Sequence, residues 1–237
     1  MAKLVFDIES SALPVESLDD AQQEYLFRDA EKIQDPAQRA ARRGEIQQWL
    51  SLWPLTAQVV CIAMLNADTD RGQVLFLAED YEDASEDGPV EFVPCLGEPE
   101  LLTAFWDVAR HYQTIITFNG RNFDVPFLYL RSALLNVPIT RKDWLGYRFQ
   151  TDPHCDLADQ LSFYGSGREG ATRRFNLDFY CKAFGIASPK SQGITGRDVT
   201  RLMGEKQYRV IAEYCLRDVE ATVALYHLWL ERLAGLK

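Results

Sequence analysis

Residues 3–9, with the sequence Lys-Leu-Val-Phe-Asp-Ile-Glu, decide how the rest of the chain is organised. Such a short, nearly continuous apolar run is typical of a buried strand. Because successive side chains of a strand point to opposite faces, Asp7 and Glu9 are expected to project together from one face. Two adjacent carboxylates on a buried strand repel each other, and a hard cation such as Mg²⁺ or Mn²⁺ relieves that repulsion. The competing interpretation places both acids in a solvated turn after the strand.

Further apolar stretches predict the rest of the fold. Strands are expected at 59–65, 73–78 and 114–118, and helices at 98–111, from 124 onward, and at 155–163, 177–184, 197–203 and 206–233. The short polar connection at 66–72 is typical of an antiparallel hairpin. Three antiparallel strands followed by a helix, a strand and another helix predict an α/β protein with a mixed sheet flanked by helices.

The length and composition of the chain favour one domain. It has 237 residues, 47% of them hydrophobic, which is enough to bury a full core. We therefore expect a single domain over residues 3–233. Residues 17–53 have helical spacing and are predicted to form a helical insertion between the first two strands, near the opening of the site; alternatively, they form an amphipathic helix that covers the sheet. The acidic stretch 79–91 is expected to be a solvated loop.

Hydropathy, cysteine content and charge limit which cellular environments and which partners fit the protein. No apolar run approaches the ~18 residues of a membrane span, so no membrane association is expected. The five cysteines are widely spaced and lack a Cys-x-x-Cys pair, which is typical of reduced thiols in a cytoplasmic protein. The net charge is −10, but it is uneven: residues 68–107 hold twelve acids and one base, whereas 166–210 hold nine bases and four acids. A local basic patch can therefore still contact an anionic partner.

A second candidate site lies in residues 116–128. Asn119 follows a predicted strand, at the kind of position where binding sites of open sheets collect. Asp124 precedes Val125 and Pro126 and is expected to be the N-cap of a helix, where an acid is ordinary for structural reasons alone.

A third candidate site lies within the predicted helix at 206–233. Tyr214 and Asp218 are four residues apart, which places the hydroxyl and the carboxylate on one helix face. Taken by itself, such a pair is also typical of an ordinary hydrogen bond on a helix surface.

The three candidate sites resemble, in the same order along the chain, the three motifs of the DEDD 3′→5′ exonuclease superfamily. They are Asp7-Ile8-Glu9, the segment 119–124 and the segment 214–218. Tyr214 is similar to the tyrosine that marks the DEDDy branch. The second motif is especially similar to the proofreading domain of family-B DNA polymerases. Because 237 residues cannot hold a polymerase, the chain most resembles the stand-alone bacterial exonucleases related to that domain.

The resemblance implies a ribonuclease H-like fold, two divalent metal ions (Mg²⁺ or Mn²⁺), and hydrolysis of single-stranded nucleic acid, with DNA favoured, from its 3′ end. It implies four metal ligands, of which Asp7 would be shared by both ions: Asp7, Glu9, Asp124 and Asp218. Tyr214 would orient the attacking water, since a phenol of pKa ~10 is a poor base at neutral pH.

The resemblance further implies that Asn119 and Phe123 contact the terminal nucleotides, although Phe123 also fits a place in the core. Six basic residues are candidates for contacts with the phosphate backbone: Arg168, Arg173, Arg174, Lys182, Lys190 and Arg197. Asp156 lies where relatives often have an acid after a short strand.

Two other functions remain open at this point. One is a nucleic-acid-binding module that has kept the fold without catalysis. The other is a phosphodiesterase for short oligonucleotides, which the acidic overall charge would suit. The segment 17–53 and the acidic loop at 79–91 have no counterpart in the family pattern.

Overall fold

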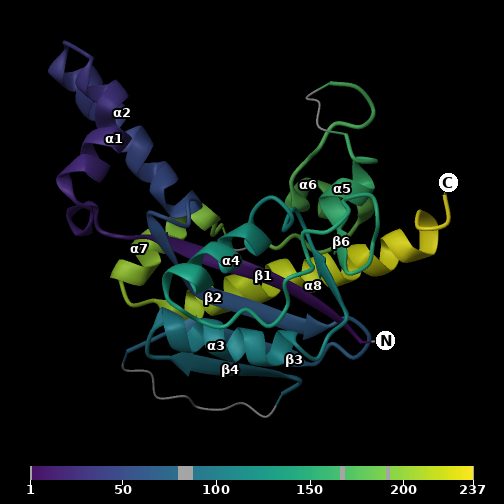
Figure 1. Ribbon diagram of the computed structural model, residues 1–237. Coiled ribbons are helices and arrows are strands. Elements are labelled where there is room, and N and C mark those ends of the chain that lie inside the picture. The colour runs from purple at the N-terminus through teal and green to yellow at the C-terminus, as the bar shows by residue number, and fades with distance from the viewer. Residues whose placement is uncertain (1, 80–87, 166–168, 191–192, 237) are drawn as a thin grey trace.

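The computed structural model describes residues 2–79, 88–165, 169–190 and 193–236. In these residues a six-stranded sheet runs in the order β4-β3-β2-β1-β5-β6 (Figure 1). The strands are β1 (Lys3–Ala12), β2 (Ala57–Asn66), β3 (Gly72–Leu77), β4 (Val90–Cys95), β5 (Thr114–Thr117) and β6 (His154–Asp156). The β1–β2 and β2–β3 pairs are antiparallel, whereas the β1–β5, β5–β6 and β3–β4 pairs are parallel. The predicted α/β class with a mixed sheet is confirmed.

Helices connect and flank the strands. They are α1 (Asp20–Glu31), α2 (Pro36–Trp49), α3 (Glu98–Ala109), α4 (Asp124–Leu134), α5 (Leu157–Leu161), α6 (Leu177–Phe184), α7 (Val199–Gly204) and α8 (Tyr208–Arg232). Short 3₁₀ turns occur as η1 (Val15–Ser17), η2 (Leu50–Leu52) and η3 (Gly196–Asp198). None of the helices within the described parts of the chain is both long and apolar enough to span a lipid bilayer.

The edge strand β4 corrects one prediction. The acidic loop expected at 79–91 ends earlier, because Val90 and Glu91 already belong to β4; residues 80–87 of that prediction lie outside the described residues. The strand was hard to predict because Pro94 interrupts its pattern, and a proline is tolerated in a strand chiefly at the edge of a sheet. β4 pairs with β3 in the parallel direction.

The sheet separates two apolar cores. Leu4, Phe6 and Ile8 of β1 face a core shared with α3 and α4, while Val5 faces the core under α8. By the alternation of a strand, Asp7 and Glu9 share the face of Val5 and project toward α8. Figure 1 shows α8 crossing behind β1.

Helices α1 and α2 extend away from the sheet as a helical pair (Figure 1). Asp19 caps α1 through a capping box with Gln22, and Asp35 caps α2 by accepting from the Gln38 amide. No residue of α2 is buried. The alternative in which this segment covers the sheet is therefore wrong.

Candidate active site on β1

The site lies where β1 has lost its pairing with β5 but still continues. The parallel β1–β5 pairing ends at Val5 and Ile116, whereas β1 continues to Ala12. Beyond this point the amide of Ile8 donates a hydrogen bond to Asp124 Oδ1 at 3.1 Å. Asp124 is the first residue of α4 and Phe123 is its N-cap, so the predicted N-cap role of Asp124 is wrong. The carboxylate is instead directed at β1.

Asp7 and Glu9 lie close together beside α8, as predicted. One carboxylate oxygen of each residue and Cys215 Sγ lie within 4.8 Å of one another. The Cys215 thiol donates to the backbone oxygen of Asp7 at 3.5 Å. Burial raises the pKa of Cys215 well above its usual range, which favours the neutral thiol. Hard cations such as Mg²⁺ and Mn²⁺ prefer the oxygens of the carboxylates to a sulfur. The carboxylates are the ligands this cluster offers.

Helix α8 adds Tyr214 and Asp218 to the same cluster. The Tyr214 hydroxyl lies close enough to the Asp218 carboxylate to lower the pKa of that carboxyl. Tyr214 is only 4% exposed. Burial and the nearby charges of Glu9 and Asp218 raise the pKa of Tyr214 above its usual value, so the phenol keeps its proton. The pair therefore belongs to the site and is not a surface hydrogen bond.

Burial, with the charges of neighbouring acids as a smaller cause, raises the pKa values of all four carboxylates. The pKa values of Asp7 and Glu9 are raised well above their usual range. Desolvation is the largest cause, and the negative charges of the neighbouring acids add to it. Burial raises the pKa of Asp124 to about 7, and the hydrogen bond from the Ile8 amide partly offsets this rise by lowering the pKa. Burial raises the pKa of Asp218 to about 6 and is opposed by the Tyr214 hydroxyl and by Lys190 and Arg217.

None of these four acids forms an ion pair within 4.0 Å with any described lysine, arginine or histidine. Glu9 and Asp124 are buried, and Asp7 and Asp218 are partly buried. Such a cluster of carboxylates without cationic partners is costly in the absence of a counter-charge. Its oxygen donors and its charge fit divalent cations such as Mg²⁺ or Mn²⁺.

Asn119 lies beside the cluster in a constrained loop. Its φ of 68° is left-handed, which asparagine tolerates better than most residues. The Asp156 carboxylate fixes this loop by accepting from the amides of Asn119 (2.8 Å), Arg121 (3.0 Å) and Ala158 (3.0 Å). A Cβ at Gly120 would collide with the Thr117 side chain, so the turn requires glycine. Asp156 thus positions the loop that carries Asn119.

A cavity next to Asn119 reaches the acids. It is lined by Asp7, Asn119, Arg174, Tyr214 and Asp218, among others. The side-chain oxygen of Asn119 accepts from Arg174 Nη1 at 3.1 Å and from Asn122 Nδ2 at 3.0 Å.

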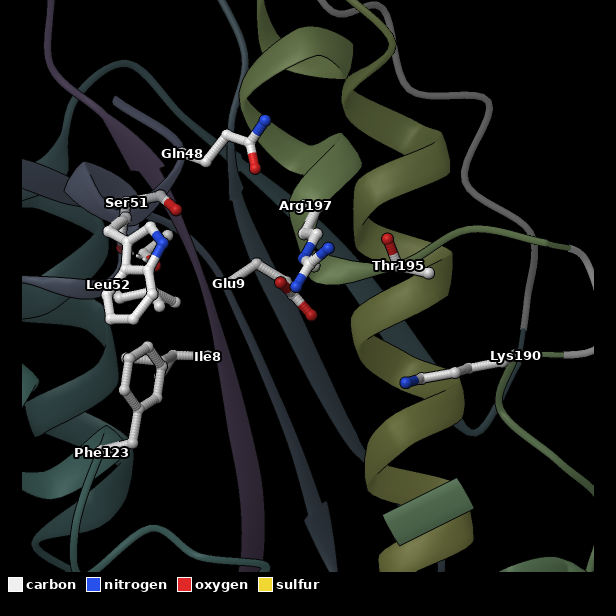
Figure 2. A pocket seen from close by; sticks show the side chains of 12 residues that line it. Ile8, Glu9, Gln48, Ser51, Leu52, Phe123, Lys190, Thr195 and Arg197 are labelled. Atoms are coloured by element: carbon white, nitrogen blue, oxygen red, sulfur yellow. Dashed lines mark hydrogen bonds between the residues drawn. The ribbon is translucent and has the colours of Figure 1, made fainter. Parts of the chain in front are cut away.

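A second cavity lies on the Glu9 side, and Figure 2 shows its lining. Phe123 is half-buried, packs on Phe127 with ring centroids 5.4 Å apart, and also lines this cavity. The core interpretation of Phe123 therefore holds in part, and its contact with the terminal nucleotides stays a prediction. Lys190 lines both cavities and is thus adjacent to the acids on either side.

The other basic candidates do not form one continuous strip. Arg174 is held by Asp159 and Asn119, Lys182 pairs with Asp178 at 2.8 Å, and Arg173 stacks on Phe175. Arg197 lines the cavity beside Glu9. Arg168 lies outside the described residues.

Sequence reasoning missed one part of the lining. Trp49 and Leu52, at the end of α2 and in η2, line the cavity beside Glu9. The available signal was a cluster of large apolar side chains, including Trp53, at the end of an otherwise polar helix.

Comparison with known proteins identifies related chains. DNA polymerase 1 of Sulfolobus acidocaldarius is 30% identical over 187 residues, which is 73% of this chain and 20% of that protein. DNA polymerase 1 of Saccharolobus solfataricus is 30% identical over 137 residues, which is 54% of this chain and 15% of that protein. The chain thus matches about a fifth or less of the length of these relatives.

The structure of the family B DNA polymerase from the hyperthermophilic archaeon Pyrobaculum calidifontis has a similar fold. The TM-score is 0.55 at 21% identity, and the match covers 97% of this chain and 24% of that one. Residues 52–235 match the sequence model of a family described as predicted 3′-5′ exonucleases related to the exonuclease domain of PolB. Since this match includes well over half of the residues, the chain belongs to that family of predicted 3′-5′ exonucleases.

Proposed function

We propose that the protein is a metal-dependent 3′→5′ exonuclease of the DEDDy type that hydrolyses single-stranded nucleic acid. The observation that carries this proposal is the meeting of four carboxylates without ion-pair partners among the described residues, contributed by α4, α8 and the part of β1 beyond its pairing with β5. Membership of the exonuclease family supports the reaction class. DNA is the favoured substrate because the relatives are DNA polymerases.

In this proposal, residues 3–233 form one exonuclease domain that takes two Mg²⁺ or Mn²⁺ ions. Asp7 would be shared, Glu9 and Asp218 would complete one site, and Asp124 would support the other. Two such ions, when bound, would activate water and neutralise charge on the phosphodiester. The raised pKa values of the acids favour this assignment, because a cation compensates the cost of holding the carboxylates ionised.

Tyr214 would position the attacking water through its hydroxyl oxygen. Its raised pKa makes Tyr214 a hydrogen-bonding group and not a base. Since the phenol keeps its proton, the contribution of Tyr214 is orientation.

Three residues would bind the strand next to the acids. Asn119 would contact the terminal nucleotide by hydrogen bonding, and the exposed part of Phe123 would stack on a base. Lys190, which lines both cavities, would contact the phosphate backbone on either side of the cleaved bond.

The test is a nuclease assay with a 5′-labelled single-stranded 30-mer, with Mn²⁺ or Mg²⁺ and with EDTA as a control. We expect a ladder of products that shorten from the 3′ end only when metal is present. A labelled dinucleotide serves as the second substrate. Binding of the 30-mer without shortening would contradict catalysis and indicate a binding module, and cleavage of the dinucleotide alone would indicate an oligonucleotide phosphodiesterase.

A further inference from the structure

The cavity beside Glu9 has two chemically different walls. Its volume is about 660 Å³, within the range of ~300–1,000 Å³ typical of ligand pockets. Figure 2 shows Ile8, Leu52 and Phe123 on one side and Arg197, Thr195 and Lys190 on the other, with Glu9 between them. Because Glu9 belongs to the acid cluster, this cavity is continuous with the proposed site of cleavage.

Trp49 contributes to this lining from the α1–α2 segment. It is the last residue of α2, its side chain is 57% exposed, and it lines the same cavity as Phe123. On the wall of a cavity, an exposed indole offers apolar area that a ligand can cover.

The backbone around Trp49 is fixed even though the ring is exposed. Leu50 is buried, and its carbonyl accepts from Thr56 Oγ1 at 2.7 Å. The carbonyl of Ser51 accepts from Ser10 Oγ of β1 at 2.6 Å. Trp49 is therefore held next to β1 by its neighbours, and a ligand that contacts the ring pays little to order it.

We propose that Trp49, together with Phe123, forms the surface on which the base of the 3′-terminal nucleoside stacks. The inference rests on the proposed function and extends it to the helical segment. An aromatic wall accepts the flat face of any base, whereas the opposite wall offers cations to the anionic backbone. Arg197 has no hydrogen-bond or ion-pair partner among the residues that the structure describes, and so it is available for this contact. An apolar peptide would leave Arg197 and Lys190 without partners, and the two cations therefore favour a nucleotide.

The first measurement compares variants on a 5′-labelled single-stranded 30-mer. Trp49→Ala is expected to raise KM about fivefold to a hundredfold, the range that stacking of one base supplies. Trp49→Phe keeps a ring and should stay within a few-fold of the wild type. Tyr25→Ala is the matched control, because Tyr25 is 70% exposed on the same helical pair but lines a separate cavity. Its KM should not change.

The second measurement repeats the comparison with a 30-mer whose 3′-terminal residue is abasic. If Trp49 acts by stacking on that base, the difference in KM between the wild type and Trp49→Ala should disappear on this substrate. A difference that persists in full on the abasic strand would show a structural role and overturn the inference.

Failure of the two proposals gives different results. A wild type that shortens the 30-mer with the same KM as Trp49→Ala overturns the role of Trp49 and leaves the exonuclease intact. A wild type that shortens neither strand overturns the exonuclease, and the role of Trp49 falls with it.

Discussion

The Ile8 amide and the Asp124 carboxylate, 116 residues apart in sequence, are joined by a hydrogen bond of 3.1 Å. The bond fixes the start of α4 against the part of β1 that has no strand partner on that side. It also directs the Asp124 carboxylate toward Asp7 and Glu9. One hydrogen bond therefore both attaches α4 to the sheet and brings Asp124 to the acid cluster.

The first prediction concerns pH and stability of the metal-free protein. The pKa of Asp124 is about 7 when folded and ~3.9 when unfolded, so between these values the folded state binds more protons and loses stability as pH rises. Asp124→Asn keeps an oxygen acceptor for Ile8 but does not titrate. In EDTA, the unfolding free energy of the wild type should therefore fall relative to Asp124→Asn by roughly 1.4 kcal/mol per pH unit from about pH 4.5 to 7.

Urea denaturation of both proteins between pH 4.5 and 8.5 measures this difference. Above about pH 8 it should be constant, because Asp124 is then ionised in both states. A difference that does not vary with pH would mean that Asp124 ionises normally in the folded protein.

The second prediction concerns metal binding. Mn²⁺ at a hundredfold excess over its Kd should stabilise the folded protein by about 2.7 kcal/mol, which is a rise in Tm of roughly 5–10 °C for a chain of this size. Asp7→Asn should lose most of that rise. Asp143→Asn, a surface acid paired with Arg141, should retain it. Differential scanning calorimetry with Mn²⁺ and with EDTA measures the shift, and an equal rise in both variants would remove Asp7 from the metal site.

The third prediction concerns catalysis by the acids. Asp7→Ala and Asp218→Ala should abolish metal-dependent shortening of single strands, because each removes a proposed ligand and leaves the other carboxylates without a bound ion. Circular dichroism should show that the fold survives. Cleavage by either variant at the wild-type rate would refute the assignment of the site.

The fourth prediction separates positioning from base catalysis at Tyr214. Tyr214→Phe should lower kcat about 10²-fold, as expected for loss of one positioned group. The hydroxyl also lowers the pKa of Asp218. Its removal should therefore move the acidic limb of the pH–rate profile to higher pH. An unchanged kcat would exclude Tyr214 from the mechanism.

The fifth prediction concerns the loop that carries Asn119. Asp156→Ala would leave three amides without their acceptor: the bond from Ala158 is buried, and those from Asn119 and Arg121 are partly buried. A buried amide without a partner costs about 1–3 kcal/mol, and a partly buried one costs less because water can reach it. We expect a total loss of roughly 2–4 kcal/mol in unfolding free energy, measured by urea denaturation. Asp156→Asn retains one oxygen acceptor and should lose clearly less. Equal losses in the two variants would show that the carboxylate oxygens do not hold the loop.

Periodic patterns predicted the parts of the site that lie on regular elements. Alternation along β1 placed Asp7 and Glu9 on one face, and the four-residue spacing on α8 placed Tyr214 beside Asp218. Contacts between distant segments could not be predicted in this way. The hydrogen bond from the Asn119 amide to Asp156 depends on the pairing of β5 with β6. The position of Trp49 depends on the hydrogen bond that joins η2 to β1.

The residues at which the α1–α2 pair leaves and rejoins the sheet, Ala12 and Ala57, are cross-strand partners. A segment with adjacent ends can be lengthened, shortened or exchanged while the register of β1 and β2, and with it the position of Asp7 and Glu9, stays the same. Under the proposed function, a different helical pair grafted between these two alanines would change which strand ends bind while Asp7 and Glu9 keep their places on β1.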